Sequence, residues 1–139
     1  MDLQQIFNMI DARKEELFQL LSSLVQIDSQ NFSSHGKEKE ICQYIQKLCL
    51  DMGLDSAMYS PMELEGFADH PDYMPGHGLE ERYNVTAVWR GETDENALML
   101  MAHSDTVQFG DPANWTFSPT SGEICDGRIY GRGSGAKPH

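Results

Sequence analysis

The stretch Ala97-Leu98-Met99-Leu100-Met101-Ala102-His103-Ser104-Asp105 decides how this chain is interpreted. Six uncharged residues end abruptly at a histidine, and an aspartate follows two positions later. A run of this length that is apolar on both faces is typical of a buried central strand. In open α/β sheets, ligands bind just beyond the carboxyl ends of such strands. The pattern therefore predicts a strand over residues 97–102 and a functional site directly after it.

His103 is the candidate metal ligand of this site. Residues i and i+2 of an extended chain point the same way, so Asp105 is expected beside the His103 imidazole. A carboxylate that holds one ring nitrogen leaves the other nitrogen for a metal ion. His-x-Asp pairs also arise by chance. The competing interpretation is a polar strand end whose histidine bonds to a neighbouring loop.

Composition limits the class of protein. The chain has 139 residues, 40% of them hydrophobic and 23% charged, which is ordinary for one globular domain. Its formal charge of −12 argues against a nucleic-acid partner, because phosphate binding needs a surplus of Lys and Arg. No apolar run approaches the ~20 residues of a membrane span, and residues 1–10 do not resemble a secretory signal. A cytoplasmic location is expected.

The three cysteines favour a reducing compartment. They are odd in number and lack CxxC spacing, and they are Cys42, Cys49 and Cys125. Small core residues are expected here, in preference to a disulfide or a cysteine metal site.

The first half of the chain reads as two helices and a short strand. Apolar residues at three- and four-residue steps predict a helix over residues 2–26, with Asp2 and Gln5 as a capping box. Residues 28–36 are polar and predict a loop, and residues 37–52 predict a second helix that ends at Gly53. The side chains expected to be buried by this second helix are Ile41, Ile45, Leu48, Cys49 and Met52. A short strand is expected over residues 56–60.

The second half combines a long loop with predicted hairpins. Residues 63–82 are acidic and rich in turn formers, and His70 and His77 within them are weaker ligand candidates because such histidines are usually at the surface. Residues 83–90 and 97–102 are joined by a short charged segment, which suggests an antiparallel hairpin. Residues 124–130 predict two further short strands around the turn Asp126-Gly127.

Two other motifs carry no independent chemistry. The glycine-rich run at residues 131–135 lacks the Gly-Lys-Ser/Thr ending of a phosphate-binding loop, so close backbone approach or positive φ explains it better. Ser104 has no Gly-x-Ser-x-Gly elbow around it, and it is not a nucleophile candidate.

Taken together, these segments resemble the amino-terminal part of a dizinc metallopeptidase family. Its members include acetylornithine deacetylase, succinyl-diaminopimelate desuccinylase, aminoacylase, dipeptidases and glutamate carboxypeptidase. The matching pieces agree in order and spacing over nearly the whole chain. They are residues 99–107, Asp111-Pro112 with Trp115, Gly122-Glu123-Ile124 and residues 126–133, with the loop at residues 69–76 similar to one in the deacetylase-like branch.

The resemblance implies a fold, a reaction and two residue roles. The fold would be α/β: the amino-terminal portion of a three-layer zinc-peptidase-like catalytic domain, with two helices and then a mixed sheet. His103 would ligate one of two zinc ions, with cobalt or manganese as alternatives, and Asp105 would be the catalytic residue that orients and polarises this histidine. A metal-bound hydroxide would attack the amide of an N-acyl amino acid or short peptide. The complete family form is expected to be able to form homodimers.

The chain departs from the family pattern near its end. After Gly-Arg-Gly, the family has two residues, a bridging aspartate, one residue and a lysine, whereas Ala136 and Pro138 stand at those two positions. The later glutamate pair, carboxylate ligand and histidine ligand do not follow, and neither does a lid or dimerisation domain. We therefore expect residues 1–139 to be part of one catalytic domain, inactive alone. We hypothesise that the coding sequence is incomplete or frameshifted. Reading the encoding DNA beyond codon 139 would test this hypothesis.

Two functions remain open on this evidence. The first is a hydrolase of amide bonds by lineage, and the second is a non-catalytic remnant that acts only as a binding module. A structural expectation accompanies both. The strand before His103 needs neighbours on both sides, so unpaired edges and exposed apolar surface are expected to promote association.

Overall fold

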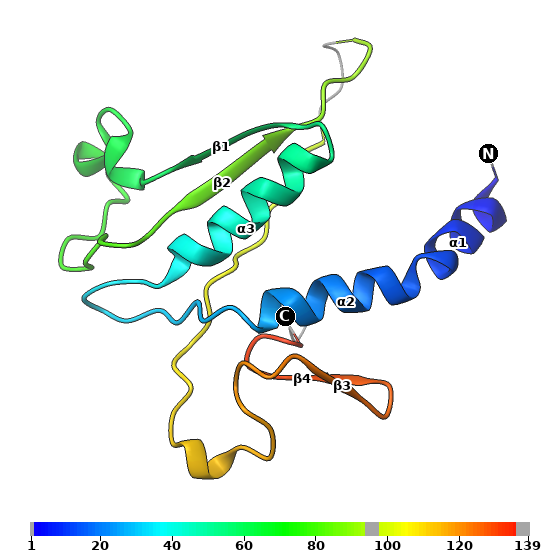
Figure 1. Ribbon diagram of the computed structural model, residues 1–139. Helices are drawn as coiled ribbons and strands as arrows, with labels where there is room; N and C mark the ends of the chain where they lie inside the picture. The colour runs from blue at the N-terminus through cyan, green and yellow to red at the C-terminus, as the bar shows by residue number, and fades with distance from the viewer. Residues whose placement is uncertain (1, 94–97, 136–139) are drawn as a thin grey trace. The chain divides into compact units, whose positions relative to one another are not determined.

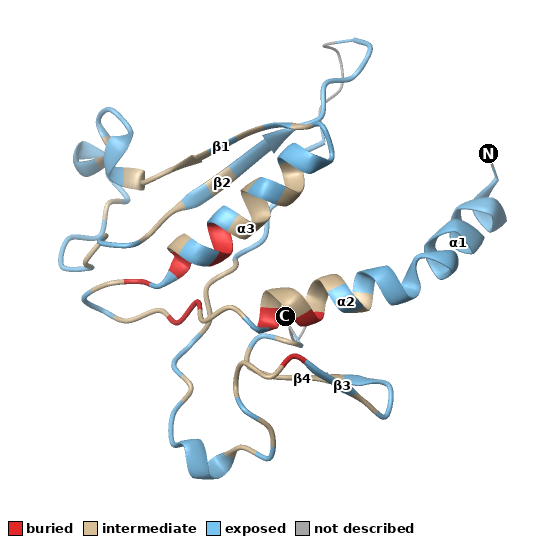
Figure 2. Ribbon diagram, in the orientation of Figure 1, coloured by how far each residue is buried: buried red, intermediate tan, exposed pale blue. Residues whose placement is uncertain are grey.

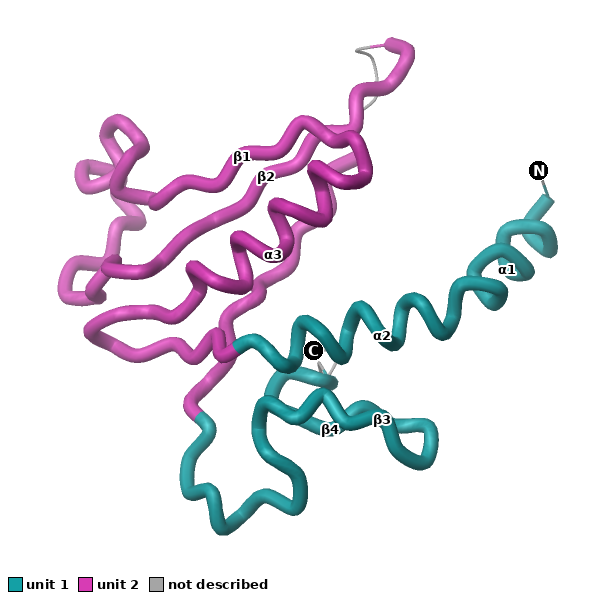
Figure 3. Tube along the Cα trace, in the orientation of Figure 1, with its two compact units in different colours: residues 1–27, 109–139 teal, residues 28–108 magenta. Residues whose placement is uncertain are grey.

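The computed structural model of the chain describes residues 2–93 and 98–135 (Figure 1). They divide into two compact units: unit 1 draws on residues 1–27 and 109–139, and unit 2 on residues 28–108 (Figure 3). The described residues combine α-helices with small antiparallel sheets, so the expected mixture of helices and strands is confirmed. In this part of the chain, no helix has the length and apolar character that a membrane span requires.

Unit 1 begins with two helices instead of the single helix predicted over residues 2–26. They are α1 (Leu3–Ala12) and α2 (Lys14–Val25). The predicted capping box is confirmed, because Asp2 Oδ1 accepts from the Gln5 N–H at 2.8 Å and Gln5 Oε1 accepts from the Asp2 N–H at 2.9 Å. The helices separate at Arg13, whose φ of −104° and ψ of 9° leave the α region.

The predicted hairpin near the end of unit 1 is present. Strands β3 (Glu123–Cys125) and β4 (Arg128–Tyr130) pair antiparallel. The two residues between them have φ values of 50° at Asp126 and 71° at Gly127. Positive φ at both positions matches the twist of a two-residue hairpin turn, which is why an Asp-Gly pair marks it in the sequence.

Glycines let the hairpin region lie against α2. Ser22 Oγ donates to the Gly122 carbonyl at 2.6 Å. Gly131 has a φ of 149°, and a Cβ on it would overlap Val25 Cγ1 and lie 2.9 Å from the Pro119 carbonyl oxygen. The interpretation of the glycine run as a site of close approach and positive φ is therefore confirmed at Gly131.

Unit 2 is built on α3 (Glu38–Asp51), which packs against strands β1 (Asp55–Tyr59) and β2 (Asn84–Val88). Its first turns carry the buried residues Ile41 and Cys42 (Figure 2). The predicted apolar face is only partly buried: Ile45, Leu48 and Cys49 are half-buried, and Met52, which follows the last turn, is exposed. Gly53 has the expected left-handed φ of 78° after the helix.

The sheet of unit 2 has a different pairing from the one predicted. β1 confirms the strand expected over residues 56–60, and it pairs antiparallel with β2 from Asp55↔Val88 to Tyr59↔Asn84. The predicted hairpin between residues 83–90 and 97–102 is therefore wrong. Two separate two-stranded antiparallel sheets, and no mixed sheet, are found in the described residues.

The buried central strand expected before His103 is also a wrong prediction. Residues 98–102 form no strand, and Ala97 lies outside the described residues. The exposed fractions are 85% at Leu98, 84% at Met99, 87% at Leu100 and 91% at Met101. An apolar run becomes a buried strand only when other strands pair with it and other side chains cover it. Within the described residues, no strand pairs with residues 98–102 and no element covers their side chains.

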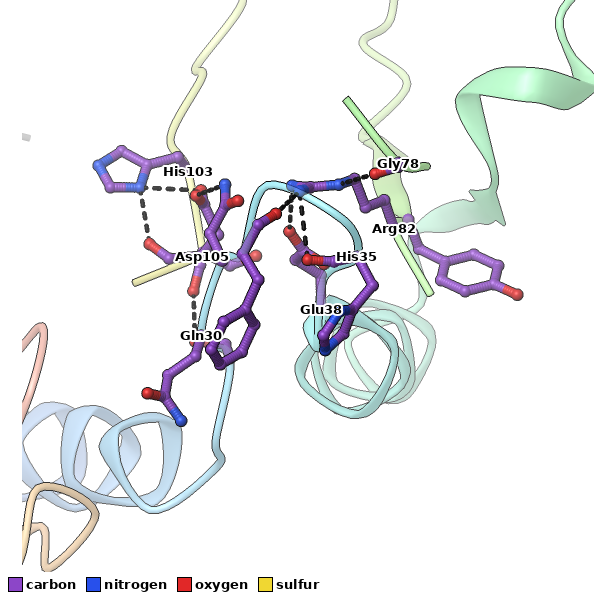
Figure 4. Close-up of polar contacts among 12 residues, drawn as sticks. Gln30, His35, Glu38, Gly78, Arg82, His103 and Asp105 are labelled. Carbon is purple, nitrogen blue, oxygen red and sulfur yellow. Dashed lines mark hydrogen bonds and ion pairs between the residues drawn. The ribbon is translucent and has the colours of Figure 1, made fainter. Parts of the chain in front are cut away.

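The loop at residues 28–36 is held by Arg82. Its Nε donates to the Gly78 carbonyl at 2.6 Å, and Nη1 donates to Glu38 Oε1 at 3.2 Å. Nη2 donates to the carbonyls of Phe32 and of His35, the latter at 3.2 Å (Figure 4). The guanidinium thus joins the loop, the start of α3 and the segment before β2.

The Glu38 carboxylate forms a mostly buried ion pair with the Arg82 guanidinium. The exposed fractions of the Glu38 and Arg82 side chains are 8% and 14%. Burial raises the pKa of the Glu38 carboxyl, while its own backbone N–H and the Arg82 charge oppose the rise. The carboxylate lies over Gly36, where a Cβ would overlap it. Removing Arg82 would therefore leave a buried carboxylate without its counter-charge.

We expect Arg82→Met to destabilise unit 2 by about 3–5 kcal/mol, since it leaves a buried charge uncompensated. The pKa of Glu38 would rise further above its unfolded value. Ionised Glu38 therefore costs most stability at neutral pH, and the loss should shrink on acidification below about pH 4, where Glu38 is protonated in both states. Urea unfolding at several pH values measures this.

Arg90→Met is the matched control for Arg82→Met. The Arg90–Asp55 pair is 2.8 Å long, but its side chains are 79% and 64% exposed, so its loss should cost no more than about 1 kcal/mol. Equal effects of the two substitutions, or an Arg82→Met effect that does not change with pH, would contradict the assigned role of the buried pair.

A second prediction concerns residues 98–101. Four consecutive exposed apolar side chains on an unpaired segment should promote self-association of the chain. Replacing Leu98 and Leu100 together by Ser should lower the associated fraction in sedimentation velocity. Met74→Ser, which changes an isolated side chain that is 68% exposed, should not. A monomeric, cooperatively melting wild-type chain would refute this prediction.

Candidate metal-ligand site

The segment that follows residues 98–102 is anchored to the loop at residues 28–36. The Thr106 N–H donates to the Ser29 carbonyl at 2.9 Å, and the Asn31 N–H donates to the Thr106 carbonyl at 2.8 Å. These bonds form a parallel bridge between Gln30 and Thr106. Ser29 Oγ adds a bond to the Ser104 carbonyl at 2.9 Å. The predicted site residues therefore lie on a backbone fixed by this loop, although no strand precedes them.

His103 and Asp105 are brought together as the i, i+2 spacing predicts. His103 Nδ1 lies 3.2 Å from Asp105 Oδ1 and 3.0 Å from the Asp105 carbonyl oxygen (Figure 4). Both oxygens are acceptors, so the hydrogen belongs on Nδ1. A neutral imidazole then has its lone pair on Nε2, the arrangement of a metal-binding histidine held by a carboxylate. The imidazole is exposed, with 84% of its side-chain surface accessible.

The second carboxylate oxygen of Asp105 has a different partner. Asn31 Nδ2 donates to Asp105 Oδ2 at 2.8 Å. Each oxygen of the carboxylate thus has its own donor, one from a side chain of the loop and one from the imidazole. Asn31 and Asp105 also line an open hollow together with Val107 and Gln108.

The weaker ligand candidates, His70 and His77, lie elsewhere in unit 2. His70 Nδ1 accepts from the Asp72 N–H at 3.2 Å in an exposed turn, and His77 is also exposed. Cys42 is buried, and its Sγ donates to the Tyr83 carbonyl at 3.3 Å. Burial raises the pKa of its thiol, which opposes the thiolate form that a metal would need.

The described residues do not fit a complete zinc site. Zinc in a protein normally takes three or four protein ligands. Across residues 2–93 and 98–135, no group of three His, Cys, Asp or Glu side chains is placed to hold a metal ion. His103 supplies one suitable nitrogen, and Asp105 is engaged by His103 and Asn31. Ala136, at the position expected for the bridging aspartate, and Pro138, at the position expected for the lysine, lie outside the described residues.

Three residues that support the site were missed in the sequence. Asn31 lies in a Ser- and Asn-rich loop that has no local motif, and Arg82 lies in the acidic stretch before β2. Glu38 looks like an ordinary exposed residue of a helix start. The isolated basic residue Arg82 among acidic neighbours was the one available signal, since a lone arginine in an acidic loop commonly has a carboxylate partner.

Curated proteins similar to this chain are hydrolases. No protein-family profile matches the chain. An uncharacterized metallohydrolase of Methanocaldococcus jannaschii is 33% identical over 121 residues, covering 86% of this chain and 28% of that protein. The succinyl-diaminopimelate desuccinylase of Rhodospirillum centenum is 38% identical over 86 residues, covering 60% of this chain and 21% of that protein. Succinyl-diaminopimelate desuccinylase 2 of a Ruegeria species is 41% identical over 51 residues, covering 37% of this chain and 13% of that protein.

These matches agree with the resemblance drawn from the motifs. The chain spans between 13% and 28% of the length of these three relatives, so the likeness concerns one part of them. They are named as a metallohydrolase and two desuccinylases, which supports a hydrolase lineage and a metal cofactor. The chain is thus similar, over part of their length, to a metallohydrolase and to succinyl-diaminopimelate desuccinylases, in agreement with the dizinc metallopeptidase family that the motifs resemble.

Proposed function

We propose that this chain is the amino-terminal part of a zinc-dependent amide hydrolase and supplies one metal ligand, His103, together with its orienting carboxylate, Asp105. The contact between His103 Nδ1 and Asp105 Oδ1 at 3.2 Å carries the proposal. It leaves Nε2 as the ring nitrogen with the lone pair, which is what a metal ligand needs. The hydrolase lineage of the relatives supports the same roles.

The substrate class follows from the relatives. Several of them are named as desuccinylases of succinyl-diaminopimelate, so we propose a small N-acyl amino acid or short peptide as the substrate of the whole protein. Zinc is the proposed metal, because an imidazole ligand suits it, and cobalt or manganese are the alternatives. A homodimer in the cytoplasm is the proposed setting.

We propose that the 139-residue chain alone has no hydrolase activity. One imidazole cannot hold a catalytic zinc ion, and the described residues offer no second and third ligand near it. The exposed apolar residues 98–101 favour an alternative in which the chain acts as a binding module. The two candidate functions differ in the role of His103: the hydrolase part needs it as a metal ligand, and the binding module does not.

Zinc titration followed by NMR tests the role of His103. Zinc added to the purified wild-type chain should shift the ring signals of His103, because its Nε2 lone pair is exposed to solvent. His103→Ala should remove the principal zinc-dependent change. His70→Ala and His77→Ala are the matched controls, and neither should alter the response at His103.

The same samples test the absence of activity. Hydrolysis of N-succinyl and N-acetyl amino acids by the wild-type chain should equal that of His103→Ala. A zinc response centred on His70 or His77 would contradict the assignment of His103. Metal-dependent turnover lost in His103→Ala would show that the chain does assemble a working site, and would refute the proposed inactivity.

A further inference from the structure

Asn31 has a contact that no motif of the chain explains. We propose that Asn31 is a positioning residue: its side-chain amide holds one oxygen of Asp105, so that the other oxygen faces His103 Nδ1 and keeps the hydrogen there. This inference rests on the proposed function, in which His103 uses Nε2 as a ligand atom. It adds a third residue to the pair that the sequence indicates.

The geometry of the carboxylate supports this role. Asn31 Nδ2 lies 2.8 Å from Asp105 Oδ2. On the other side of the carboxylate, Asp105 Oδ1 lies 3.2 Å from His103 Nδ1 (Figure 4). A carboxylate with a donor on each oxygen cannot rotate about its Cβ–Cγ bond without losing both bonds. The amide of Asn31 must present its nitrogen here, since its oxygen would face a second acceptor. The three side chains therefore have one consistent hydrogen-bonded arrangement.

The side chain of Asn31 is not needed to join the two backbone segments. The backbone bonds from Asn31 to Thr106 and from Thr106 to Ser29, at 2.8 and 2.9 Å, already join them. Ser29 Oγ adds a third bond, to the Ser104 carbonyl. The backbone bridge thus fixes where Asn31 lies, and the amide is left to act on Asp105. A substitution of the side chain should consequently change the imidazole more than the fold.

The loop that carries Asn31 is itself braced at both ends. Lys37 Nζ lies 2.7 Å from Asp28 Oδ2, and Arg82 holds the carbonyls of Phe32 and His35. Asn31 is therefore presented from a segment with fixed ends. Pre-organised donors of this kind lose little entropy when they orient a functional group.

The imidazole tautomer is the quantity that tests the proposal. In ¹⁵N-labelled wild-type chain at alkaline pH, where imidazoles are neutral, long-range ¹H–¹⁵N spectra should show His103 mainly with its hydrogen on Nδ1. Asn31→Ala should raise the fraction of the Nε2–H form, which free histidine prefers. Asp105→Ala should raise it further, although the backbone carbonyl of residue 105, 3.0 Å from Nδ1, remains as an acceptor in both variants. Asn8→Ala, on the exposed face of α1, should leave the His103 spectrum unchanged.

The possible outcomes separate the two proposals. A wild-type His103 with its hydrogen on Nε2 would overturn the proposed orientation by Asp105. A ratio of the two tautomers that is the same in the wild type and in a folded Asn31→Ala chain would overturn the role of Asn31 alone.

A second measurement needs no change at Asn31. In the wild type, one side-chain amide proton of Asn31 should be shifted downfield and exchange slowly with solvent, and Asp105→Ala should release it. A freely exchanging Asn31 amide in the wild-type chain would refute the inference even if Asn31→Ala did not fold.

Discussion

The placement of the site depends on the guanidinium of Arg82. It gathers the carbonyls of Phe32, His35 and Gly78 and the carboxylate of Glu38 around one charge. A rigid, planar donor is suited to this task because several N–H groups leave it in fixed directions. Without this guanidinium, the carbonyls of Phe32 and His35 would lose a hydrogen-bond donor, and the buried carboxylate of Glu38 would lose its counter-charge.

A sequence of contacts leads from this charge to the candidate ligand. The braced loop bonds to Thr106 through its backbone, and it presents Asn31 to Asp105. Asp105 then meets the imidazole of His103. His103 is more exposed than Asp105: the accessible fractions of their side chains are 84% and 33%. The ion pair of Arg82 and Glu38 is thus mostly buried, while the imidazole of His103 lies at the surface.

Features that depend on near neighbours could be predicted from the sequence. The capping box at Asp2, the positive φ at Gly53, the Asp126-Gly127 turn and the approach of His103 to Asp105 each involve residues at most four positions apart. Their physical causes lie in local hydrogen bonds and in the conformational freedom of particular residues. The helix over residues 37–52 was predicted for the same reason. The boundary at Arg13 was not, because no residue type marks it.

The sequence by itself determined most of the local elements, the His103–Asp105 pair and the resemblance to a metallopeptidase family. Only the tertiary structure decided that β2 pairs with β1, that residues 98–102 form no strand, and that Asn31, Glu38 and Arg82 support the site. Strand pairing and burial depend on partners distant in the chain, and the apolar character of a segment does not specify them. Asn31 and Asp105, for example, are 74 positions apart in the chain. For contacts at such separations, the spacing of residues carries no signal, and the folded chain alone brings them together.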